Sequence, residues 1–351
     1  MIRISSTKRM FSLIMSVFMV ISLLPSISLR VYGMSGDGSA SSPYLITSYG
    51  DLEEFARIVN GGEFTANARL ENDIVANDGT FSVNDDGKVL FNEVDVSESF
   101  LNEWEPIYEY IGTFDGGNHT IKGLYINSES SQVGLFGGVR QGGMIKDVVV
   151  EDGYIKGLDS VGGVCGGNYG GTIQNCHNTG TISGKDNVGG VCGDNRETIQ
   201  NCHNTGPISG MDNVGGVCGN NQGTIQNCYN TGPISGTTSV GGVCGYNQGT
   251  IQKCYNTSLV SGNENVGGVC GRNDGKIQNC YNIEPVSGNK SYVGGVCGQN
   301  NSEIQNCYNT GLVSGNSDSV GGVCGVAFAG TIEQCYYDQE MCGCLLYTSD
   351  A

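Results

Sequence analysis

The sequence predicts an all-β fold, a parallel β-helix built from coils of about 26 residues. Seven near-identical copies of one pattern follow one another from Val161 onward. The apolar residues within a copy are mostly β-branched and are separated by Gly, Asn and Pro, which favours short strands over helix. Glycine is abundant, at 58 of 351 residues, but it recurs at fixed places, which indicates repeated tight turns rather than disorder.

Each copy reads VGGVCG, then a variable turn, then a segment similar to TIQNCYN, then a stretch that usually ends in Ser-Gly. A unit of this size cannot bury a core alone, but stacked units turn each apolar position into a column. The two cysteines of the copies form two series with the same period. The first series is Cys165, Cys192, Cys218, Cys244, Cys270, Cys297 and Cys324, and the second is Cys176, Cys202, Cys228, Cys254, Cys280, Cys307 and Cys335.

Glycine and asparagine positions predict how the coils pack. The pair Gly215-Gly216 would let the backbone approach its neighbour closely. Aligned asparagines such as Asn227 and Asn230 could form amide ladders, and Asn also tolerates left-handed corners. We therefore interpret the repeated asparagines as structural.

The N-terminal part differs from the repeats. Residues 51–60 place Leu52, Phe55, Ala56 and Val59 on one helical face, and Gly61-Gly62 follows, so we expect a short amphipathic helix there. We interpret residues 34–132 as an N-terminal capping region together with the first coils, because an open end of the solenoid would expose strand edges.

The first residues predict export. Lys8 and Arg9 precede an apolar run over residues 11–24 that is too short for a membrane span and typical of a secretory signal, so we expect a signal peptide over 1–33 and no membrane span in the mature chain. The formal net charge of −18 mostly serves solubility, and it predicts that the protein does not bind nucleic acid.

The cysteines of an exported chain suggest disulfides, for example Cys218 with Cys228 within one coil. Facing sheets lie about 10 Å apart, whereas a disulfide needs Cα atoms within about 7 Å. We therefore favour buried thiols that fill space as small apolar side chains. Zinc binding by thiolates with His177 and His203 is a third interpretation, but cysteines ten residues apart follow the structural period and not a compact metal site. We expect no metal and no cofactor.

The residue after each second cysteine is aromatic, first His177 and His203 and then five tyrosines. If the cysteines point inward, these rings point outward and form a stripe that could hold a glycan or a protein partner, or that merely stabilises the coils by stacking. The tyrosines of the possible ligand stripe are Tyr229, Tyr255, Tyr281, Tyr308 and Tyr336. Variable residues in the turn after the first cysteine could form a second binding edge. They are Tyr169, Arg196, Gln222, Tyr246, Arg272, Gln299 and Phe328.

The sequences GGVCG, IQNCYNTG and the closing Cys-Tyr-Tyr-Asp of residues 335–338 resemble the GLUG repeat of bacterial surface proteins. A diverged copy without cysteine begins at Val133, so we expect the repeat region to span 133–343 and this copy to form its first coil. Residues 345–351 break the pattern, and we interpret 344–351 as a non-native or truncated tail. The resemblance implies a right-handed β-helix in a secreted or cell-surface, adhesin-like protein whose partner is a glycan or a surface protein.

The sequence offers little for catalysis. It has only three histidines and neither an HExxH nor a GxSxG motif, so we predict that the chain is not an enzyme. A carbohydrate-active enzyme of the polysaccharide lyase or glycosidase type is the alternative, although Asp186, Asp212, Glu264 and Asp318 are expected at turns. A purely structural spacer of a larger surface protein is another alternative. Some relatives that share the repeat are immunoglobulin A peptidases, whose catalytic part we expect to be absent here.

Residues 82–93 resemble a calcium-binding loop in spacing, with Ser82 in place of the leading acid. Because that acid is missing and no flanking helices are evident, we interpret the segment as a polar inserted loop.

Overall fold

The computed structural model describes residues 33–341 apart from residues 85, 99 and 317–318. The predicted signal peptide, apart from Gly33, and the predicted tail lie outside the described residues. From Met34 onward the chain forms one compact unit.

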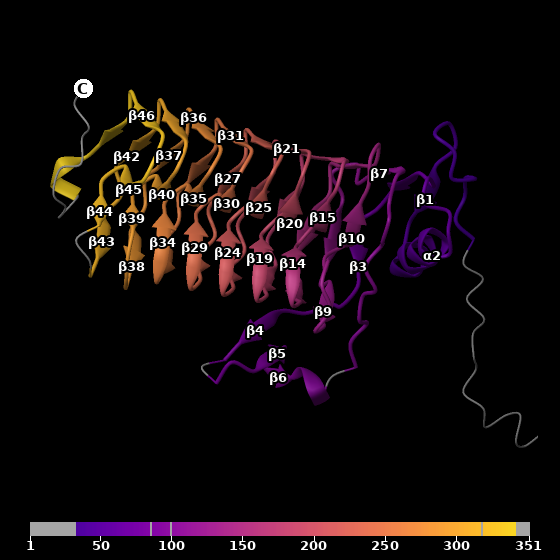
Figure 1. Cartoon of the computed structure of the whole chain (residues 1–351). Coiled ribbons are helices and arrows are strands. Elements are labelled where there is room, and N and C mark those ends of the chain that lie inside the picture. The colour runs from indigo at the N-terminus through magenta and orange to yellow at the C-terminus, as the bar shows by residue number, and fades with distance from the viewer. Residues whose placement is uncertain (1–32, 85, 99, 317–318, 342–351) are drawn as a thin grey trace, which may run out of the picture. The chain divides into compact units, whose positions relative to one another are not determined.

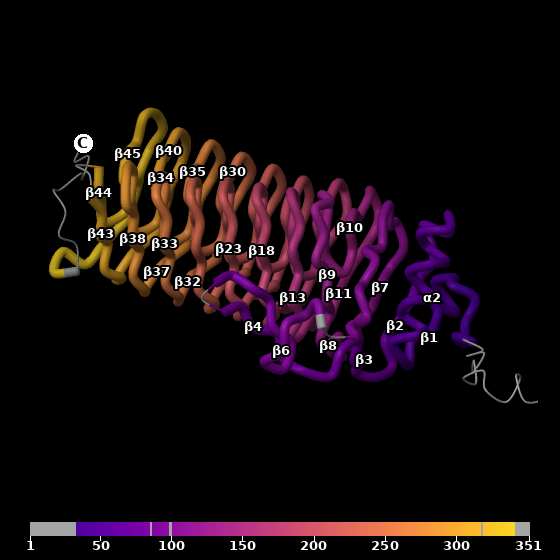
Figure 2. The backbone as a smooth tube through the Cα atoms, turned by 90° about the horizontal axis from the view of Figure 1, so that it is seen from below, coloured from indigo at the N-terminus to yellow at the C-terminus, as the bar shows by residue number. Residues whose placement is uncertain are grey.

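This unit is a stack of coils, each of which carries up to five short strands around a common core (Figures 1 and 2). Every strand of a coil pairs in parallel with the equivalent strand of the next coil, so that Cys218 lies beside Cys244 and Tyr229 beside Tyr255. The prediction of an all-β parallel solenoid is therefore confirmed. We name the five parallel sheets S1 to S5 in the order in which one coil visits them.

S1 and S2 extend furthest toward the N-terminus. The eleven strands of S1 are β1 (Tyr44–Ile46), β2 (Ala68–Leu70), β7 (Thr113–Asp115), β11 (Met144–Lys146), β16 (Thr172–Gln174), β21 (Thr198–Gln200), β26 (Thr224–Gln226), β31 (Thr250–Gln252), β36 (Lys276–Gln278), β41 (Glu303–Gln305) and β46 (Thr331–Glu333). The ten strands of S2 are β3 (Ile74–Val75), β8 (Thr120–Lys122), β12 (Val149–Glu151), β17 (His177–Asn178), β22 (His203–Asn204), β27 (Tyr229–Asn230), β32 (Tyr255–Asn256), β37 (Tyr281–Asn282), β42 (Tyr308–Asn309) and β47 (Tyr336–Tyr337). Strands of S1 and S2 thus precede the diverged copy at residue 133.

S3, S4 and S5 complete the coils. S3 contains β9 (Tyr125–Asn127), β13 (Tyr154–Lys156), β18 (Thr181–Ser183), β23 (Ile208–Ser209), β28 (Ile234–Ser235), β33 (Val260–Gly262), β38 (Val286–Gly288) and β43 (Val313–Gly315). S4 contains β14 (Asp159–Gly162), β19 (Asp186–Gly189), β24 (Asp212–Gly215), β29 (Thr238–Gly241), β34 (Glu264–Gly267), β39 (Val293–Gly294) and β44 (Val320–Gly321). S5 contains β10 (Phe136–Val139), β15 (Cys165–Asn168), β20 (Cys192–Asn195), β25 (Cys218–Asn221), β30 (Cys244–Asn247), β35 (Cys270–Asn273), β40 (Cys297–Asn300) and β45 (Cys324–Ala327).

The core consists of columns of equivalent side chains. Within one coil Val214, Val217, Ile225 and Ile234 are buried, and the same positions are buried in the neighbouring coils. Close stacking depends on glycine: a Cβ on Gly215 would lie 2.1 Å from the carbonyl oxygen of Cys218. The corners need a left-handed residue, and asparagine occupies most of them, as at Asn227 with φ 53°. The predicted roles of glycine and asparagine are confirmed.

The predicted helix is present as α2 (Tyr49–Asn60). Ser48 caps its start, because the Ser48 hydroxyl accepts a hydrogen bond from the Asp51 backbone N–H at 3.3 Å, and the chain leaves the helix at Gly61. Leu52, Phe55, Ala56 and Val59 are buried as predicted. Phe55 packs on Tyr110 and Phe114, with ring centroids 6.1 and 5.8 Å away, so the apolar face of the helix covers the first part of the core (Figure 1).

The chain leaves the solenoid after β3 and forms an antiparallel sheet of three strands, β4 (Phe81–Val83), β5 (Val89–Phe91) and β6 (Val94–Asp95), followed by a 3₁₀ turn η1 (Val96–Glu98). We call residues 81–95 the hairpin flap. A second 3₁₀ turn, η2 (Gln339–Met341), ends the described residues. The calcium-like segment 82–93 falls within the flap. Its Asn84 side-chain oxygen accepts hydrogen bonds from the backbone N–H groups of Asp86 and Lys88 at 3.1 and 2.8 Å, which builds a tight turn.

Candidate functional site: a stacked aromatic stripe

The cysteines of the repeats form two inner columns. The first series begins seven of the eight strands of S5, and the second series directly precedes seven of the ten strands of S2. All fourteen thiols of these columns are free, and all are buried except Cys335, which is half-buried. In the second column, the backbone N–H of Cys202 lies 3.3 Å from Sγ of Cys228 in the next coil. Cys218 and Cys228, the pair of the intra-coil disulfide scheme, both remain thiols in the structure.

Buried asparagines form two further columns beside the cysteines. The Nδ2 atom of each donates to Oδ1 of the next, for example from Asn204 to Asn230 and from Asn230 to Asn256, both at 2.8 Å. A second column runs from Asn168 to Asn300, in which, for example, Nδ2 of Asn195 donates to Oδ1 of Asn221 at 2.8 Å. These amides are buried and bond to one another and to nearby backbone carbonyls, such as those of Gly206 and Gly232. They therefore hold the coils in register and offer little to a ligand.

The aromatic residues after the second cysteines lie on the outer surface of S2, where the rings from His177 to Tyr308 stack in one row and Tyr336 follows in register with Tyr308. The ring centroids of Tyr229 and Tyr255 are 4.9 Å apart with planes tilted by 2°, and the same 4.9 Å distance joins Tyr255 to Tyr281 and Tyr281 to Tyr308. We call residues 229, 255, 281, 308 and 336 the tyrosine stripe. The exposed fraction of the residues rises toward the C-terminal end of the stripe, to 41% for Tyr308 and 70% for Tyr336. The stripe thus presents ring edges and phenolic hydroxyls to solvent.

Two phenols of the stripe, those of Tyr255 and Tyr281, have a raised pKa. Burial, followed by the neighbouring tyrosines, raises the pKa of Tyr281, and burial raises the pKa of Tyr255 in the same way. The hydroxyls of Tyr255 and Tyr281 therefore stay protonated at neutral pH, and each can donate one hydrogen bond and accept others. A row of such groups repeats at the spacing of the coils.

The row continues toward the N-terminus through two histidines. His177 and His203 stack with centroids 3.7 Å apart, and His203 stacks on Tyr229 at 4.6 Å. Burial and the neighbouring His203 lower the pKa of His177 to about 4, and burial lowers the pKa of His203. Within the described residues, no group of three or more His, Cys, Asp or Glu side chains is placed to hold a metal ion.

Because both histidines are neutral in the folded chain, acid should destabilise it. As pH falls from about 6.5, where an unfolded histidine titrates, toward about 4 at His177, the unfolded chain takes up protons that the folded chain does not. We expect the melting temperature of the wild type to fall more between pH 7 and pH 4.5 than that of a His177→Tyr, His203→Tyr variant, which extends the tyrosine stripe. If the melting temperatures of the two proteins fell equally with pH, the conclusion that the folded chain keeps both histidines neutral would be contradicted.

The variable residues gather on the edge of the solenoid at S5, although not all lie in a turn. Tyr246, Arg272 and Gln299 stand in register within β30, β35 and β40, so the expectation that these three lie in the turn is wrong. All three residues are half-buried, so each side chain reaches solvent in part. Tyr246 donates to the Asp274 carboxylate at 2.5 Å, and the Arg272 guanidinium lies 5.0 Å from the Tyr246 ring.

The other variable residues, Tyr169, Arg196, Gln222 and Phe328, directly follow strands of S5. The Tyr169 ring lies between two guanidinium groups, 4.7 Å from Arg140 and 4.9 Å from Arg196. The edge is therefore a series of local contacts that differ from coil to coil, without a repeated chemical group.

The acidic residues are arranged differently from the prediction. Asp186, Asp212 and Glu264 begin strands of S4 and do not lie at turns. Asp159 pairs with Asp186, which pairs with Asp212, so three carboxylates stand in one row. The sequence reasoning missed Asp159, although its spacing of 27 residues from Asp186 is one repeat. Asp318 lies outside the described residues.

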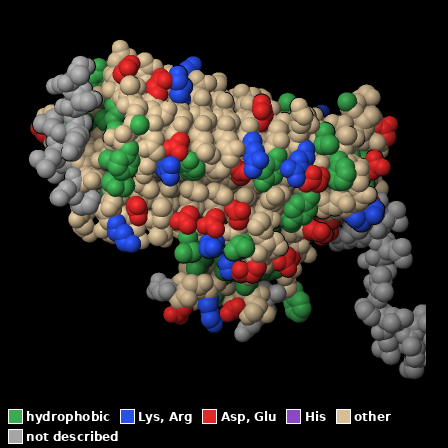
Figure 3. Space-filling view, in the orientation of Figure 1, with side chains coloured by type: hydrophobic (Ala, Val, Ile, Leu, Met, Phe, Trp, Pro, Cys, Tyr) green, Lys and Arg blue, Asp and Glu red, His purple; other side chains and the backbone are tan. Residues whose placement is uncertain are grey.

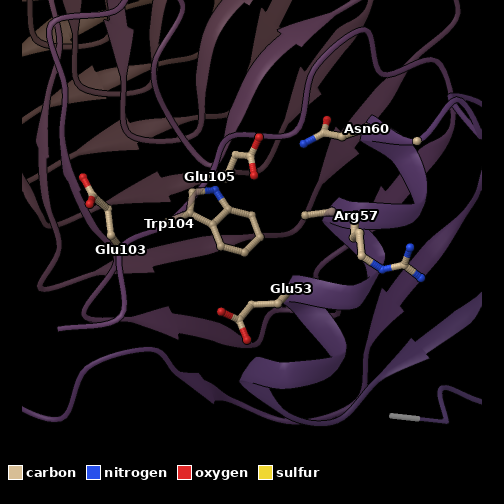
Figure 4. A pocket seen from close by; sticks show the side chains of 8 residues that line it. Glu53, Arg57, Asn60, Glu103, Trp104 and Glu105 are labelled. Atoms are coloured by element: carbon tan, nitrogen blue, oxygen red, sulfur yellow. The ribbon is translucent and has the colours of Figure 1, made fainter. Parts of the chain in front are cut away.

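A separate hollow of about 420 Å³ lies beside α2, lined by Glu53, Arg57, Asn60, Glu103, Trp104 and Glu105 (Figure 4). Trp104 is only 3% exposed, and its indole N–H donates to the Leu135 carbonyl at 3.0 Å. Its ring is thus part of the packing between the helix and the first coils.

The architecture defines the class of the protein, which is a repeat protein built as a parallel β-solenoid. The family model described as the GLUG motif matches residues 157–183, 212–235 and 289–314. The chain therefore carries GLUG-motif repeats, and the predicted resemblance is confirmed.

Two known proteins are similar to this chain in sequence or in fold. Halomucin from Haloquadratum walsbyi (strain DSM 16790 / HBSQ001) is 34% identical over 136 residues, which amount to 38% of this chain and 1% of halomucin. A crystal structure of a candidate immunoglobulin A1 protease from Bacteroides ovatus superimposes with a TM-score of 0.43 and 21% identity, covering 86% of this chain and 76% of that chain. Within the described residues, no helix is long and apolar enough to cross a membrane.

Proposed function

We propose that this chain is a secreted or cell-surface repeat protein that acts as an adhesin-like binding or scaffold module and contacts a glycan or a protein through the tyrosine stripe. The GLUG repeats and the similarity to halomucin support a surface or structural repeat protein. The observation that carries the binding role is the unbroken row of tyrosines on the outer face of S2, stacked 4.9 Å apart.

The chemistry of the stripe suits an extended partner. A column of phenolic hydroxyls at the coil spacing can exchange hydrogen bonds with a series of hydroxyl or amide groups, while the exposed ring edges supply apolar contact. A repeated array favours ligands that are themselves long, because several weak contacts add up along one chain.

Binding and stacking can be separated by mutation. We expect replacement of Tyr229, Tyr255 and Tyr281 by phenylalanine to preserve the stacked rings and the melting temperature, and to weaken ligand binding at least tenfold because three hydroxyls are lost. Replacement of the same residues by alanine should lower both the melting temperature and the affinity for the ligand. A phenylalanine variant that binds as tightly as the wild type would show that the hydroxyls take no part and would leave the stripe a stacking ladder.

A carbohydrate-active enzyme is the second candidate, and the row of Asp159, Asp186 and Asp212 is the observation that favours it. Adjacent parallel strands are about 4.8 Å apart, which is close to the separation of about 5–5.5 Å between the two carboxyls of retaining glycosidases. Analysis of products from acidic polysaccharides, with an Asp186→Asn, Asp212→Asn variant as control, tests this candidate. Turnover that disappears in the variant would replace the non-catalytic proposal.

A further inference from the structure

The hairpin flap stands beside the outer face of S3 and leaves a groove of about 830 Å³ between them. Val83, Lys88 and Asp95 line the flap side, while Lys156 and Ser209 line the side of S3. Figures 1 and 2 both show the flap alongside the early coils rather than within the stack. The groove therefore lies on a different face from the tyrosine stripe, which belongs to S2.

Aromatic packing fixes the flap at one end of this groove. The Phe81 ring stacks on Tyr125, with centroids 5.4 Å apart and planes tilted by 9°, and it also contacts Phe91 at 4.9 Å. Tyr125 and Tyr154 are 8% and 5% exposed, so both rings are nearly buried beneath the flap. This packing holds the flap against the first coils and so fixes one wall of the groove.

The other wall is a repeating surface. The outward residues of S3 form one row of hydroxyls, Ser183, Ser209, Ser235 and Ser261, which stand in register from coil to coil. A second row of Pro207, Pro233 and Leu259 runs beside it, and these two rows line a smaller hollow of about 150 Å³ that continues from the groove. The surface thus offers a row of hydroxyl groups beside a row of apolar side chains, each repeated at the strand spacing of about 4.8 Å.

The groove also differs in charge from the rest of the chain. Its lining contains two basic residues on opposite walls, Lys88 and Lys156, and one acidic residue, Asp95. The whole chain, in contrast, has a formal net charge of −18. Lys88 pairs with Asp95 at 3.4 Å and Lys156 with Glu129 at 3.7 Å, but the two lysines are 66% and 41% exposed. Exposed ion pairs of this kind contribute little, so both ammonium groups can turn to an anionic ligand. Figure 3 shows charged side chains of both signs around the flap.

We propose that the groove binds a linear anionic polysaccharide that runs along the solenoid axis from the flap over the outer face of S3. Lys88 and Lys156 bind its carboxylate or sulfate groups, the serine row exchanges hydrogen bonds with its hydroxyls, and Pro207, Pro233 and Leu259 contact the apolar faces of its rings. The site is independent of the proposed role of the tyrosine stripe, because the two surfaces share no residue.

Isothermal titration of the full chain with polygalacturonate, and with dextran as the neutral probe, tests the proposal. We expect the wild type to bind polygalacturonate and not dextran, with an affinity that falls as salt is raised. A Lys88→Gln, Lys156→Gln variant should bind at least tenfold more weakly. A Lys253→Gln, Lys290→Gln variant, which loses the same charge at positions outside the groove, should bind within twofold of the wild type.

Two further variants distinguish binding in the groove from binding elsewhere on the solenoid. Ser209→Phe fills the groove without changing charge and should abolish binding, while the phenylalanine variant of the tyrosine stripe should bind polygalacturonate normally. Absence of binding by the wild type, equal binding of dextran, or equal losses in the two lysine variants would each overturn the proposal. Loss of binding only in the stripe variant would overturn it as well and would assign the glycan to the stripe.

Discussion

Replacement of Asn230 by alanine is expected to destabilise the folded chain by roughly 3–5 kcal/mol, the cost of orphaned buried amides together with a cavity. Asn230 accepts a hydrogen bond from Asn204 and donates to Asn256, each at 2.8 Å, and it also donates to the Gly232 carbonyl at 2.7 Å. The substitution leaves the amides of Asn204 and Asn256 without this partner in the core. The midpoint of urea unfolding, followed by circular dichroism, measures the effect.

An amide ladder on the surface supplies the matched control for Asn230. Gln226 accepts from Gln252 at 2.7 Å, but it lies on the half-buried outer face of S1, where water can replace the lost bond. We expect Gln226→Ala to cost less than about 1 kcal/mol. Similar losses in the two variants would contradict the conclusion that the buried asparagine columns hold the coils together.

Replacement of Gly216 by alanine is expected to be at least as damaging. The new Cβ would lie 2.2 Å from the Gly242 carbonyl oxygen and 2.4 Å from Cγ of Asn230, so two neighbouring coils would have to move apart. Both obstacles belong to the tightly packed interior, where a shift breaks several ladder bonds at once. We expect a loss of more than about 3 kcal/mol, visible as a lower unfolding midpoint or as insoluble protein.

Gly138→Ala serves as the control for Gly216. The nearest atom to a Cβ on Gly138, which lies in a strand of S5, is the side-chain Oε1 of Gln132 at 3.5 Å, an ordinary contact. We expect this variant to unfold within about 1 kcal/mol of the wild type. An equally small loss of stability in Gly216→Ala would contradict the conclusion that successive coils approach closely at this glycine.

The repeat made most of the solenoid predictable from the sequence. Seven aligned copies fix which residues face inward, because a parallel stack must place equivalent residues beside one another, as it does for Ile225 and Ile251. The helix was predictable for a local reason, since Leu52, Phe55 and Val59 follow a helical period and glycine ends it.

The features that depend on contacts between different parts of the chain were not predictable. The groove arises because Phe81 of the inserted flap packs on Tyr125 and Tyr154, residues that are distant in sequence and carry no motif. The row from Asp159 to Asp212, by contrast, did carry a sequence signal, because Asp159 precedes Val161 by the same two residues that separate Asp186 from Val188 one repeat later. The inserted flap lies outside the regular repeat, so alignment of the copies did not reveal the groove.

The proposed binding role of this solenoid depends above all on the outer tyrosine stripe. The most direct measurement applies the full chain and its Tyr229→Phe, Tyr255→Phe, Tyr281→Phe variant to an array of glycans and matrix proteins, with product analysis of every polysaccharide that is bound. We expect selective binding by the wild type, loss of part of that binding in the variant, and no cleavage. Cleavage of a bound polysaccharide, or identical binding profiles of the two proteins, would contradict the proposed role.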